Sequence, residues 1–214
     1  MLKFIKTSLL AAAVAAVGLW APSTASATTQ TIATGSQTGT FGPNVRGFWF
    51  TAPVNFWITG VDVPTSASTA NFNVAILRLP ATPPAWSGTT NTFDILGDFR
   101  NQASAVTGLS IAVSAGDVIG VLGNRGDSNS YGSQFVTNIL GHSVTLSRFG
   151  SQAPLSSTPT ANLNVWQEPP GPISRVSLTI DSENPSAPAV PLPASVPLLL
   201  SGLGVIAAIR RKRA

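Results

Sequence analysis

The sequence predicts an all-β fold: an antiparallel two-sheet sandwich with jelly-roll-like connections, preceded by an N-terminal signal peptide and followed by a C-terminal hydrophobic helix. Three observations predict it. Short apolar runs in the middle of the chain are separated by Gly, Pro, Asn, Ser and Thr. Several runs alternate apolar and polar residues with period two, as strands with one buried face do. No segment there carries a sustained 3.6-residue apolar stripe with helix caps, so we expect at most one or two short turns of helix.

The N-terminal segment has the three parts of a secretory signal peptide. Two lysines precede an apolar run over residues 9–19, and small residues, among them Ala25 and Ala27, follow. This order is typical of signal peptides. A first transmembrane helix is the alternative, but the run is short and Pro22 follows it. We expect residues 1–27 to be removed, with Ala25 and Ala27 at the cleavage positions, and the chain to be exported.

Residues 28–181 are predicted to form the β domain. Strands at such short spacing are typical of antiparallel sandwiches and barrels, and we prefer the sandwich. Two long proline-rich connections begin at Pro80 and Pro154, and they contain Trp86 and Trp166. The candidate strands are residues 45–50, 56–63, 72–79, 92–98, 109–113, 118–122, 134–139, 143–148 and 175–180.

The basic character of the chain belongs to its two ends. The formal net charge is +4, but six of the twelve basic residues lie in the first six residues and in residues 210–213. Between residues 28 and 189 there are six arginines and eight carboxylates, which gives a formal charge of −2. The arginines are spread at intervals and form no stripe for phosphates, so a nucleic-acid partner is rejected.

The chain has no cysteine. An exported domain of about 150 residues buries enough surface to fold without disulfides, so one domain is expected. The absence of cysteine also excludes zinc–thiolate sites, thiol nucleophiles and lipoprotein anchoring. We expect no cofactor.

Residues capable of catalysis are sparse. His142 is the sole histidine, and its neighbour Ser143 would point to the opposite face of a strand, so no Ser–His pair is predicted. Asp94 and Asp98 would lie about 13 Å apart along a strand, too far for the paired carboxylates of a glycosidase. Glu168 lies in a predicted loop, where carboxylates are usually solvated. The sequence therefore predicts a non-enzymatic protein, with a secreted hydrolase as the alternative.

A turn-rich loop offers oxygen ligands for calcium. Asn124, Asp127 and Asn129 are candidates because Ca²⁺ prefers carboxylate and amide oxygens. The EF-hand pattern is absent and only one local residue is a carboxylate, so we predict no metal site and keep calcium as a hypothesis. Asp117, between Gly116 and a strand, is expected to satisfy backbone N–H groups of a turn.

The C-terminal segment combines an extended motif, an apolar run and a basic cluster. Residues 182–189 have no apolar face and are predicted to be a spacer. An apolar run over residues 195–209 follows the motif, near the lower limit of a membrane span. A permanent membrane anchor and a buried core helix are the alternatives. The motif is Val190, Pro191, Leu192, Pro193 and Ala194, and the basic cluster is Arg210, Arg211, Lys212 and Arg213.

These three features, in this order over about the last 25 residues, resemble the sorting signal of the PEP-CTERM family in its Val-Pro-Leu-Pro-Ala variant. The resemblance implies transient insertion in the inner membrane of a Gram-negative bacterium, with the basic cluster in the cytoplasm. It also implies processing by an exosortase-type enzyme for release to, or attachment at, the cell surface. Leu192 departs from the commoner pattern, which has Glu there.

The resemblance further implies a setting in biofilm or exopolysaccharide. We therefore expect a structural or adhesive role in the extracellular matrix. The alternative is a carbohydrate-binding module, in which Trp86 and Trp166 are candidate glycan contacts because aromatic rings stack on sugar faces. Packing of the two tryptophans within their loops remains the other interpretation.

Overall fold

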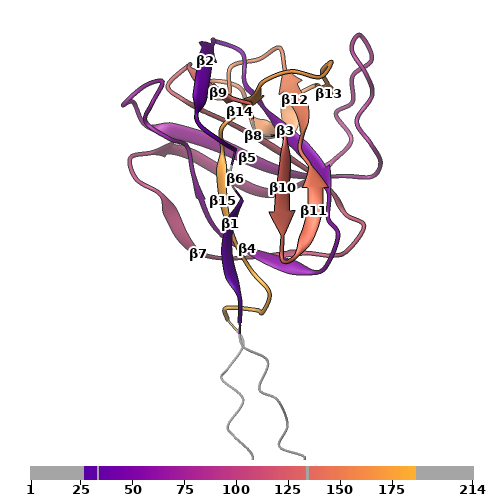
Figure 1. Ribbon diagram of the computed structural model, residues 1–214. Helices are drawn as coiled ribbons and strands as arrows, with labels where there is room; N and C mark the ends of the chain where they lie inside the picture. Colours follow the sequence, from indigo (N-terminus) through magenta and orange to yellow (C-terminus); the bar gives the residue numbers. More distant parts are fainter. Residues whose placement is uncertain (1–26, 33, 134, 187–214) are drawn as a thin grey trace, which may run out of the picture.

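The structure, a computed structural model, describes residues 27–32, 34–133 and 135–186. These residues form antiparallel sheets and one described turn of 3-10 helix, η2 (Thr160–Asn162) (Figure 1). Over these residues, the prediction of antiparallel β-structure with very little helix is confirmed. Residues 1–26, the end of the spacer, the Val190–Ala194 motif, the predicted hydrophobic helix and the basic cluster lie outside the described residues.

The largest sheet has six strands, and its central strands are buried on both faces. Every residue of β5 except Arg78 is buried, as is every residue of β8 except Val118. In spatial order its strands are β13 (Val165–Gln167), β12 (Ser147–Ser151), β3 (Arg46–Thr51), β8 (Val118–Arg125), β5 (Phe72–Leu79) and β6 (Asp94–Gln102).

Three smaller sheets complete the described fold. The four-stranded sheet has the order β1 (Thr29–Ile32), β15 (Ser177–Asp181), β4 (Phe56–Asp62) and β7 (Val106–Val113). The three-stranded sheet has the order β14 (Ile173–Ser174), β9 (Asn129–Gly132) and β2 (Gln37–Phe41), and the two-stranded sheet pairs β10 (Val136–Ile139) with β11 (His142–Thr145).

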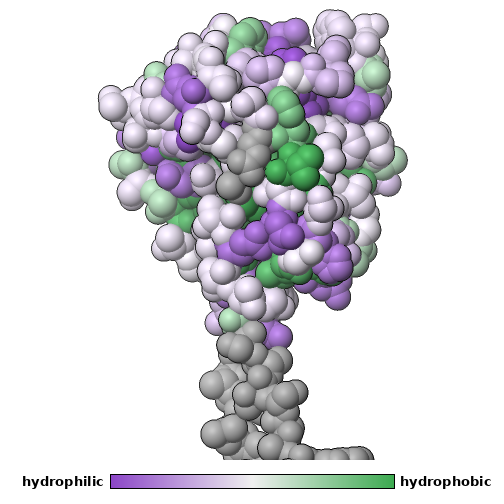
Figure 2. Space-filling view, viewed as in Figure 1, coloured by the Kyte–Doolittle hydropathy of each residue, from purple (hydrophilic) through white to green (hydrophobic). Residues whose placement is uncertain are grey.

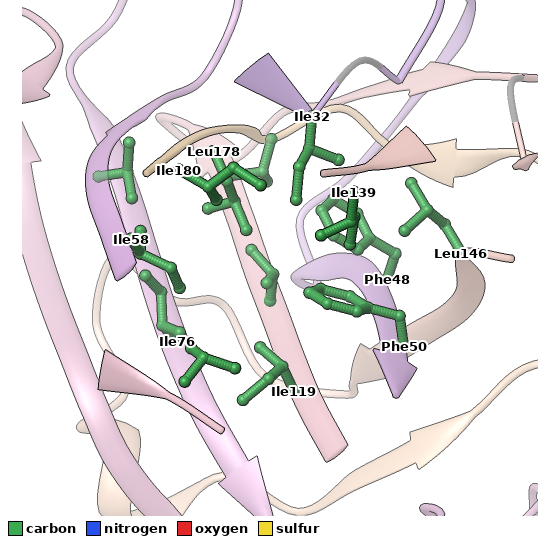
Figure 3. Close-up of a cluster of buried hydrophobic side chains, with 14 of the residues drawn as sticks. Ile32, Phe48, Phe50, Ile58, Ile76, Ile119, Ile139, Leu146, Leu178 and Ile180 are labelled. Carbon is green, nitrogen blue, oxygen red and sulfur yellow. The ribbon is translucent and has the colours of Figure 1, made fainter. Parts of the chain in front are cut away.

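The main hydrophobic core takes side chains from both large sheets (Figure 3). Phe48 and Ile119 of the six-stranded sheet belong to the same buried cluster as Ile58 and Ile180 of the four-stranded sheet. The alternation in β4 and β15 turns one face of each strand toward this cluster, as the period-two pattern predicts. Burial of this apolar surface is the dominant favourable term in folding.

A second cluster covers the opposite face of the six-stranded sheet. Leu77 and Leu122 of the sheet pack there with Leu155 and Leu163, which come from the connection around η2. Arg100 of β6 holds this connection in place, because its guanidinium donates to the backbone oxygen of Leu155 and to the hydroxyl of Thr160.

The predicted strands match the structure best in the core. The prediction for residues 72–79 coincides with β5, whereas the single strand predicted over residues 143–148 is two strands, β11 and β12. The predicted loop around Trp166 contains β13, which is a correction. Strands β1, β2, β9 and β14 were not predicted. Their segments are short, and β1, β2 and β9 are rich in Thr, Gln, Gly, Ser or Asn.

The two ends of the domain leave it side by side. Strand β1 pairs with β15 over four residues, from Thr29 opposite Asp181 to Ile32 opposite Leu178. Beyond this ladder, Ser182 N–H donates to the Thr28 carbonyl at 3.2 Å. Figure 1 shows these ends at the bottom of the domain, whereas β2, β9 and β13 lie at the top.

The surface is mixed in polarity. Figure 2 shows small hydrophobic areas between pale and hydrophilic residues, with one patch over the start of β10, where Phe135 and Val136 are exposed. Among the residues that the structure describes, no helix is long and apolar enough to cross a membrane.

Candidate functional site

The proline-rich connection between β5 and β6 is held along β13 by backbone hydrogen bonds. Trp86 N–H donates to the Gln167 carbonyl at 3.3 Å. Thr90 and Val165 exchange two backbone hydrogen bonds, of 3.0 and 2.8 Å. Proline favours this extended path because its ring fixes φ near the extended region. The pairing places Trp86 beside Trp166, so the structure brings the two predicted glycan contacts together.

The two tryptophans play different parts. Their ring centroids lie 4.7 Å apart with the planes inclined by 49°. Trp86 is 55% exposed, whereas Trp166 is only 2% exposed. Trp166 is therefore a buried support beneath Trp86, and it lies on β13 and not in a loop. Its burial favours the packing interpretation for Trp166, whereas Trp86 stays a candidate glycan contact.

Two hollows adjoin this pair, and Trp86, Trp166 and Gln152 line both. The first has a volume of about 370 Å³, and the remaining residues of its wall are uncharged. They are Thr89, Ser151, Ala153, Asn162 and Asn164. The wall thus combines an exposed aromatic ring with hydroxyl and amide groups.

The second hollow, of about 240 Å³, has charged residues in its wall. Besides the three shared residues, Arg148, Glu168 and Pro169 line it. Glu168 is the sole carboxylate among the residues that line either hollow. We call the two hollows together the Trp86 cleft.

Glu168 is held between two arginines. The Arg46 Nε lies 2.6 Å from its Oε1, and the Arg148 guanidinium pairs with its Oε2. The Glu168 side chain is 10% exposed and that of Arg46 is 7% exposed. The prediction of a solvated carboxylate at Glu168 is therefore wrong. With two cations and one anion, the cluster has one uncompensated positive charge.

Arg46 is built into the domain by several contacts. Its Nη1 donates to the carbonyls of Val45 and Ser151 at 2.9 and 2.6 Å. Its Cζ lies 5.5 Å from the centre of the Trp166 ring and 4.7 Å from that of Phe41, both within cation–π range. Gly150 leaves room for the arginine, because a Cβ there would lie 2.7 Å from the Arg46 Cδ.

Tyr131 adjoins the same cluster. Its ring stacks on Phe41, with centroids 6.0 Å apart, and the Arg148 Cζ lies 5.9 Å from its centre. Burial, aided by the negative charge of Glu168, raises the pKa of Tyr131 above its ordinary 10, although Arg46 and Arg148 oppose the rise. The dominant cause is desolvation, which disfavours the charged phenolate.

The calcium candidates do not share one set of free oxygens. The Asn129 amide is already hydrogen-bonded within the protein: its Oδ1 accepts from Arg46 N–H at 2.8 Å, and its Nδ2 donates to the carbonyls of Phe41 and Asn44. Asp127 is exposed and accepts from the Ser156 hydroxyl. Asn124 is fully buried. Within the described ranges, no three residues among His, Cys, Asp and Glu gather as a metal site.

The remaining candidates lie apart from the Trp86 cleft. His142 is exposed at the first position of β11, as predicted for a strand-end histidine. Asp94 and Asp98 are exposed on β6. Asp117 accepts from Ser114 N–H at 2.9 Å, which confirms its predicted role in the turn. Ala25, the sorting motif and the basic cluster fall outside the described residues, while Ala27 is the first described residue.

Sequence reasoning missed Arg46, Arg148 and Gln152 as parts of the site. A usable signal was present for the arginines, since each stands inside or beside an apolar strand pattern and charged residues there need a buried partner. The identity of that partner among eight carboxylates depends on long-range pairing of β3, β12 and β13.

No protein-family model, curated protein or solved structure matches this chain.

Proposed function

We propose that this chain is an exported cell-surface or extracellular-matrix protein with a structural or adhesive role in exopolysaccharide. In this proposal residues 1–27 direct export, and the C-terminal segment holds the protein in the inner membrane. An exosortase-type enzyme then processes it at the Val190–Ala194 motif. The sequence of those two ends is the basis for the route.

The observation in the structure that carries the proposal is the placement of the domain's two ends. Thr28 and Ser182 are joined by two hydrogen bonds, one from Ser182 N–H to the Thr28 carbonyl and one from Thr28 N–H to the Ser182 hydroxyl. A leader and a tail would therefore both attach at one end of the domain. The opposite end, with β2, β9 and β13, would face away from the membrane (Figure 1).

We also propose that the two large sheets form a jelly-roll-like sandwich. In support, the main core draws side chains from the six-stranded and the four-stranded sheet, and aligned packing of antiparallel sheets around a shared core is the defining feature of sandwiches. The domain would then be a rigid support for the surface at the end that carries β2, β9 and β13.

The Trp86 cleft favours a second function, that of a carbohydrate-binding module. An exposed indole beside hydroxyl and amide groups is the combination that packs against the apolar face of a sugar while hydrogen-bonding its rim. Glycoside hydrolysis generally uses a pair of carboxylates, whereas the walls of this cleft contain Glu168 alone. The cleft therefore supports binding without cleavage better than a hydrolase.

The proposal of export and sorting is tested by intact mass and fractionation of the native protein from its host. Loss of both residues 1–27 and the segment beyond the motif, with the protein at the surface or in the medium, is expected. A double substitution of Pro191 and Pro193 by alanine should leave the tail attached. The matched control replaces Pro185 and Pro188 of the spacer and should be processed normally. Retention of residues 210–213 in the unsubstituted protein, with all of it in the inner membrane, would overturn the proposal.

A further inference from the structure

We propose that the Trp86 cleft binds an acidic polysaccharide, with a neutral sugar in the uncharged hollow and a carboxylate-bearing sugar in the hollow beside Arg148. The inference rests on the carbohydrate-binding function proposed above and specifies its ligand. Three features of the cleft carry it: the fixed indole, the unused amides and the unequal charge of the two hollows.

The indole of Trp86 is exposed although its backbone is fixed. Backbone pairing with β13 on both sides of Trp86, and contact with the buried Trp166, hold it in place. A ring that is already ordered loses little conformational entropy when a ligand packs on it. Because Trp86 lines both hollows, two neighbouring sugars of one chain can contact it.

The uncharged hollow presents polar groups that the fold does not use. Asn162 and Asn164 are exposed, and neither side chain has a hydrogen-bond partner among the described residues. Gln152 accepts from Asn44 through its Oε1, at 2.6 Å, which leaves its amide N–H groups available. Amides offer both donors and acceptors, as the hydroxyls of a neutral sugar require.

The second hollow differs because a cluster of two arginines and one carboxylate lies in or beside its wall. Arg148 lines the hollow and its side chain is 22% exposed; it pairs with Glu168 and donates through Nη1 to the Pro169 carbonyl at 3.4 Å. The buried Arg46, which does not line the hollow, also pairs with Glu168, so the cluster keeps one positive charge that Glu168 does not balance. Arginine binds carboxylates through a planar fork of N–H donors, so a uronic acid is the sugar that fits this hollow. The formal charge of −2 between residues 28 and 189 would weaken any long-range attraction. Preference for an acidic glycan must therefore come from this local charge, which salt screens over about 8–10 Å.

The test measures binding of the purified full-length protein to two probes by calorimetry. One is an oligosaccharide in which neutral hexoses alternate with glucuronate, and the other is the same oligosaccharide after carboxyl reduction. We expect the acidic probe to bind about tenfold more tightly at low salt, as a hydrogen bond to a charged group predicts. This preference should shrink at high salt.

Variants separate the parts of the cleft. Trp86→Ala should abolish binding of both probes, whereas Trp57→Ala, a tryptophan substitution on the four-stranded sheet, should change neither. Arg148→Gln should remove the preference for the acidic probe, and Arg148→Lys, which keeps the charge but not the planar fork, should keep only part of it. Thermal unfolding identifies any variant that fails to fold. The salt dependence of the preference for the acidic probe, measured on the unsubstituted protein, tests the role of charge without any substitution.

Equal affinity for the two probes would overturn the acidic ligand while leaving carbohydrate binding intact. No binding of either probe, or binding that survives Trp86→Ala, would overturn both. Neither result bears on export and sorting, which the mass measurement tests separately.

Discussion

Replacement of Glu168 by glutamine should be among the most destabilising conservative changes in the domain. The substitution keeps the shape of the side chain but removes the negative charge between Arg46 and Arg148. Two like charges then remain at the site, and the Arg46 side chain is almost wholly buried. Removal of one partner of a buried ion pair costs about 3–5 kcal/mol, because it leaves a desolvated charge without compensation.

The expected loss lies at the lower end of that range. Arg46 retains two carbonyl acceptors, from Val45 and Ser151, and the faces of Phe41 and Trp166. We therefore expect the free energy of unfolding to fall by about 3 kcal/mol. For a domain of this size the thermal midpoint should fall by about 10 °C. Equilibrium urea denaturation followed by circular dichroism measures the free energy, and a thermal scan measures the midpoint.

The control is Asp98→Asn, which breaks the ion pair of Asp98 with Arg100 on β6. Both side chains of that pair are partly exposed, so solvent screens their attraction and the change should cost about 1 kcal/mol or less. If Glu168→Gln lowers the free energy of unfolding no more than Asp98→Asn does, burial does not strengthen the ion pairs of Glu168 with Arg46 and Arg148, and the reasoning fails.

Three further outcomes follow from particular contacts. The phenol of Tyr131, the sole tyrosine, should titrate above pH 10, which ultraviolet absorbance measures. Because its pKa is raised in the folded state, the stability that the phenol proton contributes is complete below pH 10 and is lost as the pH rises through the folded-state pKa. Glu168→Gln should lower that pKa. Gly47→Ala should lower the free energy of unfolding by about 3 kcal/mol or more, because a Cβ would overlap the backbone of β8. Gly39→Ala is its control, since nothing lies within 4 Å of a Cβ there; equal urea midpoints for the two would contradict the clash. Asp117→Ala should cost about 2 kcal/mol in urea denaturation, because the carboxylate accepts from a backbone N–H and from Arg78; no change would show that water replaces both contacts.

The sequence predicted the strands of the core because burial imposes a period that can be read locally. Residues 72–79 form β5 because their near-continuous apolar run suits a strand covered on both faces. The boundary between β11 and β12 could not be predicted in this way. Val144 and Leu146 both face the core, so the alternation continues while the chain passes from the two-stranded sheet to the six-stranded sheet.

The polar strands escaped prediction for a related reason. The segment of β1, Thr-Gln-Thr-Ile, buries only Ile32, and its place in the fold depends on pairing with β15 at the far end of the chain. Its ladder with β15 is made by backbone groups, which are common to all residues. A short polar strand therefore leaves almost no local signal.

The candidate site was half predictable. Trp86 and Trp166 were identified as candidates because aromatic rings stack on sugar faces, but their mutual contact depends on pairing between the Trp86 connection and β13. Glu168, between Gln167 and Pro169, has no local feature that distinguishes a buried carboxylate from a solvated one. Its environment is decided by Arg46 and Arg148, on other strands of the same sheet.

The separation of the chain ends from the Trp86 cleft matters for the proposed route. The β1–β15 ladder fixes Thr28 and Ser182 together, so cleavage in the tail would alter the chain only beyond that ladder. The cleft is built on β13 and the connection from β5, at the other end of the domain (Figure 1). If the proposed route is correct, the membrane-held precursor and the processed protein should therefore bind the glucuronate probe with the same affinity. A difference between the two forms would mean that the tail contacts the cleft, and the two ends of the domain would then not act independently.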